Sequence, residues 1–252
     1  MDLETRQLQK ILEDAQQHPE MLMLKHVTTS TNDDVREIAR KGVQSVLVCS
    51  TKQTQGRGQR QREWVSPEGN IYLSTLLNTQ IPIDGRLALE IALNILQISS
   101  LKNLDLQVKW PNDLYSLKGK WGGILVEPLS PHQLIVGVGI NLAPIPKADI
   151  DQHVTSLNEL GIASISRPQL IAELYMAIQQ AGEWFNHNCY HLAARFNHCA
   201  AFKNETVTFE HHTGQCSGIF LGIQDDGAVK IETEDGLKYF YQGRLRRLDS
   251  AV

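Results

Sequence analysis

Apolar residues recur at helical spacing in several segments of the chain. In residues 3–17, Leu8, Ile11, Leu12 and Ala15 lie three or four positions apart, which predicts a short amphipathic helix. Residues 87–101 are rich in Leu, Ile and Ala and predict a buried helix. Residues 168–186 predict a long helix with Pro168 in its first turn, and residues 190–197 predict a shorter one.

Shorter apolar runs lie between these helices and have the length and the flanking turn residues of strands. They cover residues 22–27, 44–51, 70–77, 121–127 and 133–139, and an alternation in 106–110 leads into a turn at Pro111 and Asn112. After the first run, Ser30-Thr31-Asn32-Asp33-Asp34 predicts the start of a helix that continues to about Arg40, with Thr31 as its N-cap.

The pattern changes near residue 200. Short β-rich runs follow one another in residues 205–210, 217–223, 228–232, 237–241 and 243–248. Asp225-Asp226-Gly227 and Glu234-Asp235-Gly236 are hairpin turn signals between them, which predicts a small antiparallel barrel. We therefore expect an N-terminal helix in residues 1–20, a main domain in 21–200 and a small barrel in 201–252.

Composition limits the class of protein. The 252 residues are 42% apolar, as in globular proteins, and the net charge of −4 gives no general attraction to nucleic acids or anionic membranes. The first residues lack the basic and apolar regions of a secretory signal, and no apolar run reaches the roughly 20 residues of a membrane helix. Four widely spaced cysteines without a C-x-x-C pair indicate free thiols in a reducing cytosol. We expect a cytoplasmic protein that uses no membrane.

One basic stretch, residues 53–64, differs from the rest of this acidic chain, and we call it the Arg loop. It holds Arg57, Arg60 and Arg62 beside Gly56 and Gly58. Guanidinium groups bind phosphate oxygens in pairs and glycine lets the backbone come close to them, so the loop suits a polyanion. A solvated surface loop is the alternative. Neither G-x-x-x-x-G-K-[ST] nor G-x-G-x-x-G occurs, which disfavours the two commonest nucleotide-binding folds.

Two further polar stretches follow among apolar strands, at residues 109–114 and 119–125. Lys120 begins an apolar strand, where a lysine either meets an anionic partner or reaches solvent from a strand edge. Asn112-Asp113 is either a plain turn or a site at which Asp113 holds Mg²⁺ or orients an amine. The Arg loop and these two stretches together predict one nucleotide site built from loops.

The motifs in this region resemble those of the biotin–protein ligases, in order and in spacing, from about residue 22 to the end. They are Ser30-Thr-Asn32, Gln53-x-x-Gly-Arg-Gly-x-Arg-x-Arg-x-Trp64, Lys109-Trp-Pro-Asn-Asp-Leu114, Lys120-x-x-Gly-Ile-Leu125 and Gly137-Val-Gly-Ile-Asn141. The resemblance implies an α+β fold: a mixed β-sheet backed by helices, as in the biotin/lipoate ligase catalytic domain, with a small C-terminal SH3-like β-barrel.

The resemblance also implies a two-step reaction. Biotin and ATP are the substrates, Mg²⁺ assists, and no tightly bound cofactor is needed. The biotin carboxylate attacks the α-phosphate to give biotinyl-5′-AMP and pyrophosphate. A lysine of a biotin carboxyl carrier domain, of the acetyl-CoA carboxylase type, then attacks the mixed anhydride and expels AMP.

By the same resemblance, residue roles carry over to matching positions. Catalysis is assigned to Lys120, Arg57 and Asp113, with Asp113 also a candidate Mg²⁺ ligand. Biotin binding is assigned to Ser30, Thr31, Asn32, Gln53, Gly56, Arg57, Gly58, Gln59 and Lys120. Adenylate binding is assigned to Arg57, Arg60, Arg62, Trp64, Lys109, Asn112, Lys120 and Asn141.

The chain departs from the family at two points. Relatives commonly read Gly-Arg-Gly-Arg-Arg-Gly-Arg in the Arg loop, whereas Gln59 and Gln61 stand here, which predicts a weaker hold on the adenylate. About twenty residues precede the first strand, too few for the DNA-binding module of some relatives, so we expect no DNA partner. Some relatives pair their sheets edge to edge and others stay single, which leaves a homodimer open.

Other interpretations use the same residues differently. A lipoate-type ligase shares the domain type, and an RNA- or nucleotide-binding protein would use the Arg loop with Arg244, Arg246 and Arg247 as a second basic patch. A zinc site would need His187 and His191 on one helix face near Cys199, and the cysteines lie in no nucleophile motif. We favour biotin ligation over these alternatives.

Overall fold

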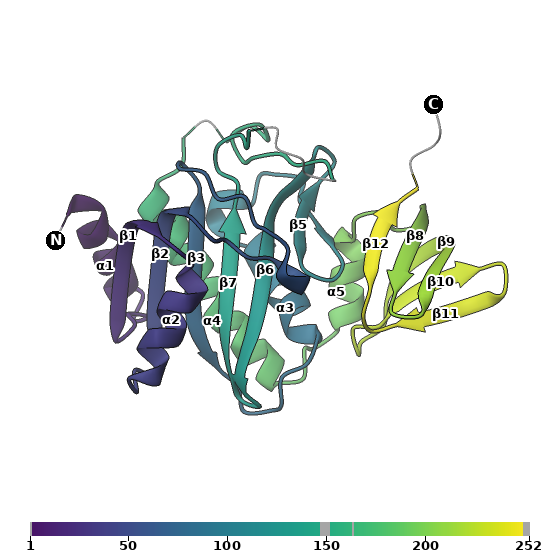
Figure 1. Cartoon of the computed structure of the whole chain (residues 1–252), viewed down its shortest axis with the longest axis horizontal. Coiled ribbons are helices and arrows are strands. Elements are labelled where there is room, and N and C mark those ends of the chain that lie inside the picture. The colour runs from purple at the N-terminus through teal and green to yellow at the C-terminus, as the bar shows by residue number, and fades with distance from the viewer. Residues whose placement is uncertain (1, 147–151, 163, 249–252) are drawn as a thin grey trace.

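The computed structural model describes residues 2–146, 152–162 and 164–248 and arranges them around two β-sheets. A seven-stranded sheet forms the larger part of the molecule, and a five-stranded sheet lies beside it at the C-terminal end (Figure 1). No helix in these ranges is both long and apolar enough to cross a lipid bilayer.

The large sheet has the strand order β1-β2-β3-β7-β6-β5-β4. Its strands are β1 (Met21–Thr28), β2 (Val46–Gln53), β3 (Ile71–Asn78), β4 (Gln107–Lys109), β5 (Asp113–Ser116), β6 (Gly119–Ser130) and β7 (Gln133–Ile140). Strands β1 and β2 are parallel, and every other neighbouring pair is antiparallel. The sheet is therefore mixed, as predicted.

Helices cover both faces of this sheet. Helix α2 (Thr31–Arg40) lies on one face, and α1 (Leu3–Asp14), α3 (Arg86–Leu96) and α4 (Arg167–Asn186) lie on the other (Figure 1). Strand alternation explains the two layers. Along β7, Leu134, Val136 and Val138 belong to the large core under the three helices, whereas Ile135 packs with Val35 of α2. The alternation of side chains along β7 thus determines which face packs against the three helices and which face can line a site.

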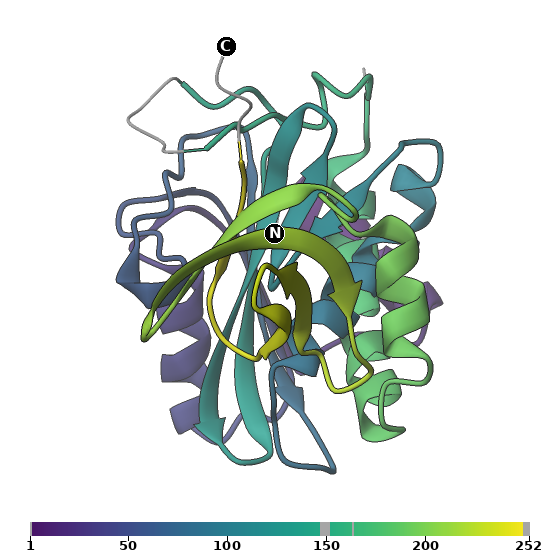
Figure 2. The ribbon, with the colours of Figure 1, turned by 90° about the vertical axis from the view of Figure 1, so that its right-hand side faces the viewer.

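The small sheet is antiparallel throughout, in the order β11-β10-β9-β8-β12. Its strands are β8 (Thr206–His211), β9 (Gly214–Ile223), β10 (Val229–Thr233), β11 (Gly236–Phe240) and β12 (Arg244–Arg247). The sheet is strongly curved (Figure 2). Strands β11 and β12 are its edges, and no pairing between them closes the sheet within the described residues.

The two sheets are joined by helix α5 (Leu192–Cys199) and by one buried tryptophan. Helix α5 packs against β4 of the large sheet and β9 of the small one. Trp110, which follows β4, donates from Nε1 to the Gly227 carbonyl at 3.1 Å and packs against Phe209 with ring centroids 5.7 Å apart. This contact brings the edge strand β12 close to the end of β4, which becomes important for the site.

Several predicted boundaries and one predicted helix face were wrong. Ser30, in extended conformation, is the N-cap of α2, and Thr31 is its first residue. The helix predicted at 87–101 ends at Leu96 and is followed by a separate 3₁₀ turn, Ser99–Leu101. His187 follows the end of α4 and His191 has a φ of 51° before α5, so the two histidines share no helix face.

Candidate active site

A cavity of about 190 Å³ lies on the α2 side of the large sheet. Its walls come from the start of α2, the Arg loop, β6, β7 and the edge strand β12. The structure brings together around it the following predicted residues: Ser30, Thr31, Asn32, Gln53, Arg57, Gly58, Gln59, Arg60, Arg62, Trp64, Lys109, Asn112, Asp113, Lys120 and Asn141. Segments more than a hundred positions apart in the chain therefore meet at one place.

Three glycines of β6 and β7 line the cavity where it meets the sheet. Gly123 of β6 pairs with Gly139 of β7, and Gly137 lies two positions away on the same face. A Cβ on Gly139 would lie 2.7 Å from the Trp64 indole, and one on Gly137 would collide with the Asn32 amide. Side chains at these three positions would fill the space, so their absence makes the cavity.

Gly56 is the one predicted site residue outside the cavity lining. A Cβ there would collide with Ser66 Oγ and with the Trp64 carbonyl, and the Trp64 N–H donates to the Gly56 carbonyl at 2.9 Å. The glycine therefore serves the close packing of the Arg loop on itself. The structure thus gives Gly56 a packing role in holding Trp64, and its contact with biotin stays a prediction.

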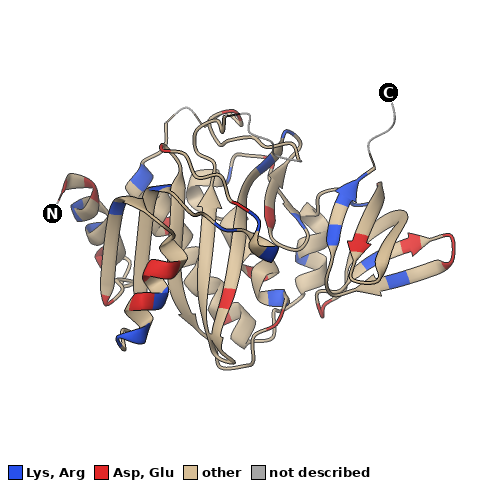
Figure 3. Cartoon of the chain, in the orientation of Figure 1, with Lys and Arg blue, Asp and Glu red and all other residues tan. Residues whose placement is uncertain are grey.

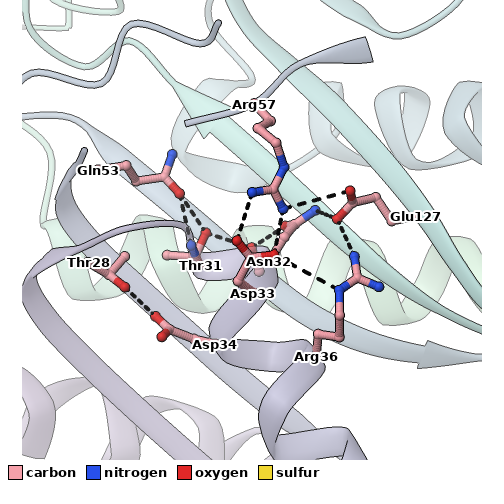
Figure 4. Close-up of polar contacts among 10 residues, drawn as sticks. Thr28, Thr31, Asn32, Asp33, Asp34, Arg36, Gln53, Arg57 and Glu127 are labelled. Atoms are coloured by element: carbon pink, nitrogen blue, oxygen red, sulfur yellow. Dashed lines mark hydrogen bonds and ion pairs between the residues drawn. The ribbon is translucent and has the colours of Figure 1, made fainter. Parts of the chain in front are cut away.

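Neutral hydrogen-bonding groups line one end of the cavity, at the start of α2. Gln53 Oε1 accepts from the Thr31 N–H at 2.9 Å and lies 3.1 Å from the Thr31 hydroxyl. Ser74 Oγ lies 2.7 Å from Thr31 Oγ1 and 2.5 Å from Asn32 Oδ1. These hydrogen bonds fix the orientations of the Thr31, Asn32 and Gln53 side chains (Figure 4). The chemistry of this end suits an uncharged polar group.

An ion-pair network connects α2 with the Arg loop. Acidic residues of α2 lie near the basic loop that crosses β7 and β6 (Figure 3). Arg57 donates to Asp33 with both terminal nitrogens, at 2.7 and 2.6 Å, and lies 3.9 Å from Glu127 (Figure 4). Glu127 in turn accepts from Arg36 at 2.9 Å and from Asn32 at 2.7 Å. The Arg57 side chain also keeps the pKa of the Asp33 carboxyl below its usual value.

Three charged side chains form a second, more deeply buried cluster. Lys120 Nζ lies 2.5 Å from one oxygen of Asp113, and Lys109 Nζ lies 3.6 Å from the other. Lys120 Nζ also lies 5.0 Å from the centre of the Trp64 ring. Burial lowers the pKa of Lys109, an effect that Asp113 opposes and that the charges of Lys120 and Arg244 reinforce. Two ammonium groups and one carboxylate leave an excess positive charge that favours an anion.

The segment after β7 holds the backbone of Lys120 in place. Lys120 N–H donates to the His153 carbonyl at 3.0 Å, and the Thr155 N–H donates to the Lys120 carbonyl at 2.8 Å. Asn141 is buried, and its side-chain amide donates to the Thr155 carbonyl at 3.0 Å. Asn141 thus lines the cavity, but its side-chain amide donates to the segment that flanks Lys120.

Comparison with known proteins relates the large sheet and the small sheet to the same kind of protein. Residues 24–141 match the model of the biotin/lipoate A/B protein ligase family, and residues 203–244 match the model of the biotin protein ligase C-terminal domain. The biotin–[acetyl-CoA-carboxylase] ligase of Paracoccus denitrificans is 30% identical over 238 residues, covering 83% of this chain and 93% of that protein. The corresponding ligase of Mycobacterium tuberculosis is 30% identical over 217 residues, covering 81% and 80%. The chain belongs to the biotin protein ligase family.

A solved member of the biotin protein ligase family has the same overall fold. The structure of the Aquifex aeolicus biotin protein ligase in complex with biotin and ATP superposes with a TM-score of 0.80 and 27% sequence identity. The match covers 90% of this chain and 99% of that chain. The similarity therefore includes both sheets.

The small sheet of this biotin protein ligase family member contributes to the cavity itself. Gly243, Arg244 and Leu245, at the start of β12, line it. Leu245 is buried in the core, and a Cβ on Gly243 would collide with the Phe209 ring, so this segment packs closely against the small sheet. Arg244 was considered from the sequence only as part of a basic surface patch. Its place at the cavity beside Lys109 was missed.

The outer part of the Arg loop is exposed. Gln59, Arg60, Gln61 and Arg62 are all solvent-accessible, and Arg60 and Gln61 both have a φ of 58°. Gln61 stands where the biotin ligase resemblance leads us to expect glycine, the residue that adopts this conformation without strain. The two glutamines therefore change both the charge and the backbone preference of the loop.

The arrangement around Asp113 does not fit a metal ligand. Both of its oxygens face lysine ammonium groups, which compete with a cation for the carboxylate, and the described ranges contain no cluster of three or more His, Cys, Asp or Glu side chains around it. The candidate zinc site at His187, His191 and Cys199 likewise has no such cluster. We therefore assign no protein-held Mg²⁺ to Asp113, and we treat the ion as part of the ATP substrate.

The cysteines lie away from the chemistry. None of Cys49, Cys189, Cys199 and Cys216 is among the residues that line the cavity. Burial raises the pKa of Cys49 and of Cys199 to about 11, which keeps both thiols protonated and unreactive at neutral pH. This agrees with a reaction that proceeds without a cysteine nucleophile.

Proposed function

We propose that the protein is an ATP-dependent ligase that activates biotin as biotinyl-5′-AMP and transfers it to a lysine of a biotin carboxyl carrier domain. Membership of the biotin protein ligase family supports this, and relatives named biotin–[acetyl-CoA-carboxylase] ligase support the type of carrier. The observation that carries the proposal is the pairing of a neutral end and a cationic end in one cavity, which matches the two halves of the adenylate.

The cationic end suits the first step. A carboxylate must approach a phosphate, so two anions have to be brought together, and fixed positive charges lower the energy of that encounter. Lys120 and Lys109 are buried ammonium groups, and the Arg57 guanidinium, which is already paired with Asp33, lines the cavity as well. In this mechanism Lys120 contacts both the biotin carboxylate and the α-phosphate, while Lys109 and the arginines stabilise the remaining phosphate charge.

The neutral end suits the ureido ring of biotin. Ser30, Thr31, Asn32 and Gln53 offer hydroxyl and amide groups without a net charge, as an uncharged polar ring requires. The Trp64 indole, which the resemblance assigns to adenylate binding, would in this proposal also cover the thioether ring and side chain of biotin. Its Nε1 is buried and has no hydrogen-bond acceptor among the described residues, a deficit that an oxygen of the bound ligand would correct.

Asp113 is assigned to the second step. The incoming lysine must lose a proton before its amine can attack the anhydride. When the ATP phosphates attract Lys120 and Lys109, the ion pairs of Asp113 with these two lysines weaken. The Asp113 carboxylate then becomes available to the incoming ammonium group. In this proposal the carboxylate exchanges partners as the reaction proceeds.

The finer architecture also belongs to the proposal. We assign residues 21–200 to a catalytic domain, residues 1–20 to an N-terminal helix and residues 201–252 to a small domain of the SH3-like barrel type. The curvature of the five-stranded sheet and the C-terminal domain match support the last assignment. A homodimer, if it pairs sheets edge to edge, would use an edge strand of the large sheet, and β1 is one of the two edges.

One experiment separates the candidates. The protein is incubated with ATP, Mg²⁺ and a biotin carboxyl carrier domain, with either biotin or lipoate, and the carrier mass is measured. A biotin-sized mass increase that requires ATP supports the proposal, whereas an increase with lipoate alone supports the lipoate-type ligase. Absence of either would reject both. RNA binding is the weaker candidate because Arg246 and Arg247 form ion pairs with Glu210 and Glu205.

A further inference from the structure

Asp33 lies outside the cavity and binds the side chain of Arg57, which lines it. Arg57 lines the cavity, whereas the Asp33 carboxylate, one position beyond the predicted Ser30-Thr31-Asn32 turn, does not. The pair is bidentate, with Nη1–Oδ2 at 2.7 Å and Nη2–Oδ1 at 2.6 Å (Figure 4). Two parallel hydrogen bonds fix the plane of a guanidinium as well as its distance.

The surrounding charges make this arrangement specific. Glu127 lies 3.9 Å from Arg57 and accepts from Arg36 at 2.9 Å, and Arg36 Nε lies 4.0 Å from Asp33. Two arginine and two carboxylate side chains thus alternate in a ring of ion pairs whose net charge is zero. Asn32 donates to Glu127 at 2.7 Å, which ties the ring to the neutral end of the cavity.

Holding Arg57 also holds the Arg loop. The loop is a small hairpin in which the Gly58 N–H donates to the Arg62 carbonyl at 2.8 Å and the Trp64 N–H donates to the Gly56 carbonyl at 2.9 Å. Arg57 lies between these two bonds, and its backbone pairs with that of Glu63 across the hairpin, while its side chain points to Asp33. Its side chain is therefore the contact that fastens the middle of the hairpin to α2.

We propose that Asp33 is a positioning residue that fastens Arg57 to α2 and thereby orders the Arg loop before substrates bind. The hydrogen bonds that Arg57 donates lower the pKa of Asp33, and the Arg57 charge adds to this effect, so the carboxylate stays ionised at neutral pH and the contact persists. A loop that is already ordered binds its ligand without an additional ordering cost. The kinetic part of this proposal rests on the proposed ligase activity, whereas the ordering part does not.

Hydrogen exchange of the substrate-free protein tests the ordering. The amides of Gly58 and Trp64 report on the hairpin, and the variant is Asp33→Asn. The matched control is Asp34→Asn, because Asp34 is the next residue of α2 and pairs with Lys25 at 2.9 Å and Thr28 at 2.8 Å, away from the cavity. We expect exchange at Gly58 and Trp64 to become about fivefold faster in Asp33→Asn and to stay unchanged in the control. Equal exchange in all three proteins would overturn the proposal.

Kinetics test whether Asp33 acts through Arg57. A loop that orders only upon binding raises KM while the closed complex keeps its kcat. We expect Asp33→Asn to raise the KM for ATP about fivefold with kcat changed less than twofold, and Asp33→Glu to restore part of it. In an Arg57→Gln background, Asp33→Asn should add nothing further. An undiminished effect in that background would contradict the proposal. An inactive wild type with the expected exchange pattern would reject only the ligase assignment.

Discussion

Lys120 and Asp113 form a buried ion pair, with Lys120 Nζ 2.5 Å from Asp113 Oδ1. Lys109 lies 3.6 Å from the other oxygen, so one carboxylate faces two ammonium groups. Both Lys109 and Lys120 are less than a tenth exposed. The site therefore keeps an uncompensated positive charge close to its centre, where the proposed reaction needs it.

Loss of the Lys120 charge should impair adenylate formation while the fold persists. In Lys120→Gln, Asp113 retains Lys109 as a partner, so no carboxylate is left buried and unpaired. Removing one fixed stabilising group from a reacting centre lowers kcat by roughly 10²–10³-fold. Biotin-dependent ATP–pyrophosphate exchange measures the loss, and Lys118→Gln is the control because Lys118 is exposed and donates to the Glu159 carbonyl. Equal activity of the Lys120 and Lys118 variants would refute the role of Lys120.

The lowered pKa of Lys109 predicts how stability depends on pH. Because the pKa in the folded state is below that in the unfolded chain, the unfolded chain binds more protons between the two values. The free energy of unfolding therefore rises with pH in that window, which ends near the ordinary lysine pKa of about 10.4. Denaturant unfolding of wild type and Lys109→Met isolates the contribution. We expect wild type to gain stability relative to the variant as pH increases toward the end of this window, and a parallel pair of curves would contradict it.

Part of the site could be predicted because its residues stand in short motifs. Lys120 and Asp113 could be identified because charged side chains next to apolar strands indicate a charged partner or a functional role. Gly137-Val-Gly139 carries a further signal in the spacing of its two glycines. Glycines at a period of two on a buried strand leave one face without side chains, and this predicts a cavity floor.

Other contacts depend on how the strands pair and the helices pack, and the spacing of residues along the sequence does not predict them. Asp33 meets Arg57 only because α2 follows β1 and returns over β2, and Glu127 joins them through its position opposite Ile135 on β7. Arg244 reaches Lys109 because Trp110 fastens the small sheet to β4. Each contact joins elements whose relative placement is a property of the whole fold. The helix ends were missed for a simpler reason, since Ser30 and Thr31 are both good N-cap residues.

A side chain on the cavity floor should displace Trp64. In Gly139→Ala the added methyl group would come within 2.7 Å of the indole, which has no space to retreat without moving the Arg loop. Overpacking of this kind costs about 1–3 kcal/mol, and we expect the KM for biotin to rise by roughly five- to a hundredfold. Gly85→Ala is the control, because no atom lies within 4 Å of its added Cβ and its φ is −63°. An unchanged KM in Gly139→Ala would argue against Trp64 as a wall of the biotin site.

The edge strand β12 should contribute to the nucleotide end of the cavity. Arg244 lies near Lys109, and we expect bound polyphosphate to relieve their mutual repulsion. We expect Arg244→Gln to raise the KM for ATP about tenfold and to leave the KM for biotin unchanged. Arg247→Gln is the matched control on the same strand, since Arg247 is mostly exposed and pairs with Glu205 at 2.8 Å. Equal effects on both substrates would indicate a general loss of structure instead.

The two glutamines of the Arg loop should affect how long the adenylate stays bound. Gln59 lines the cavity and stands where relatives commonly have arginine, whereas Gln61 is exposed and lies outside the lining. Gln59→Arg adds a cation that can reach the adenylate phosphate, a contact worth roughly 1–3 kcal/mol. Release of biotinyl-5′-AMP, followed after rapid dilution, should slow by about five- to a hundredfold. Gln61→Arg adds the same charge two positions away and should change release little. If both variants slow release equally, net charge is the cause, and if Gln59→Arg leaves the rate unchanged, the native loop holds the adenylate as firmly as an arginine would.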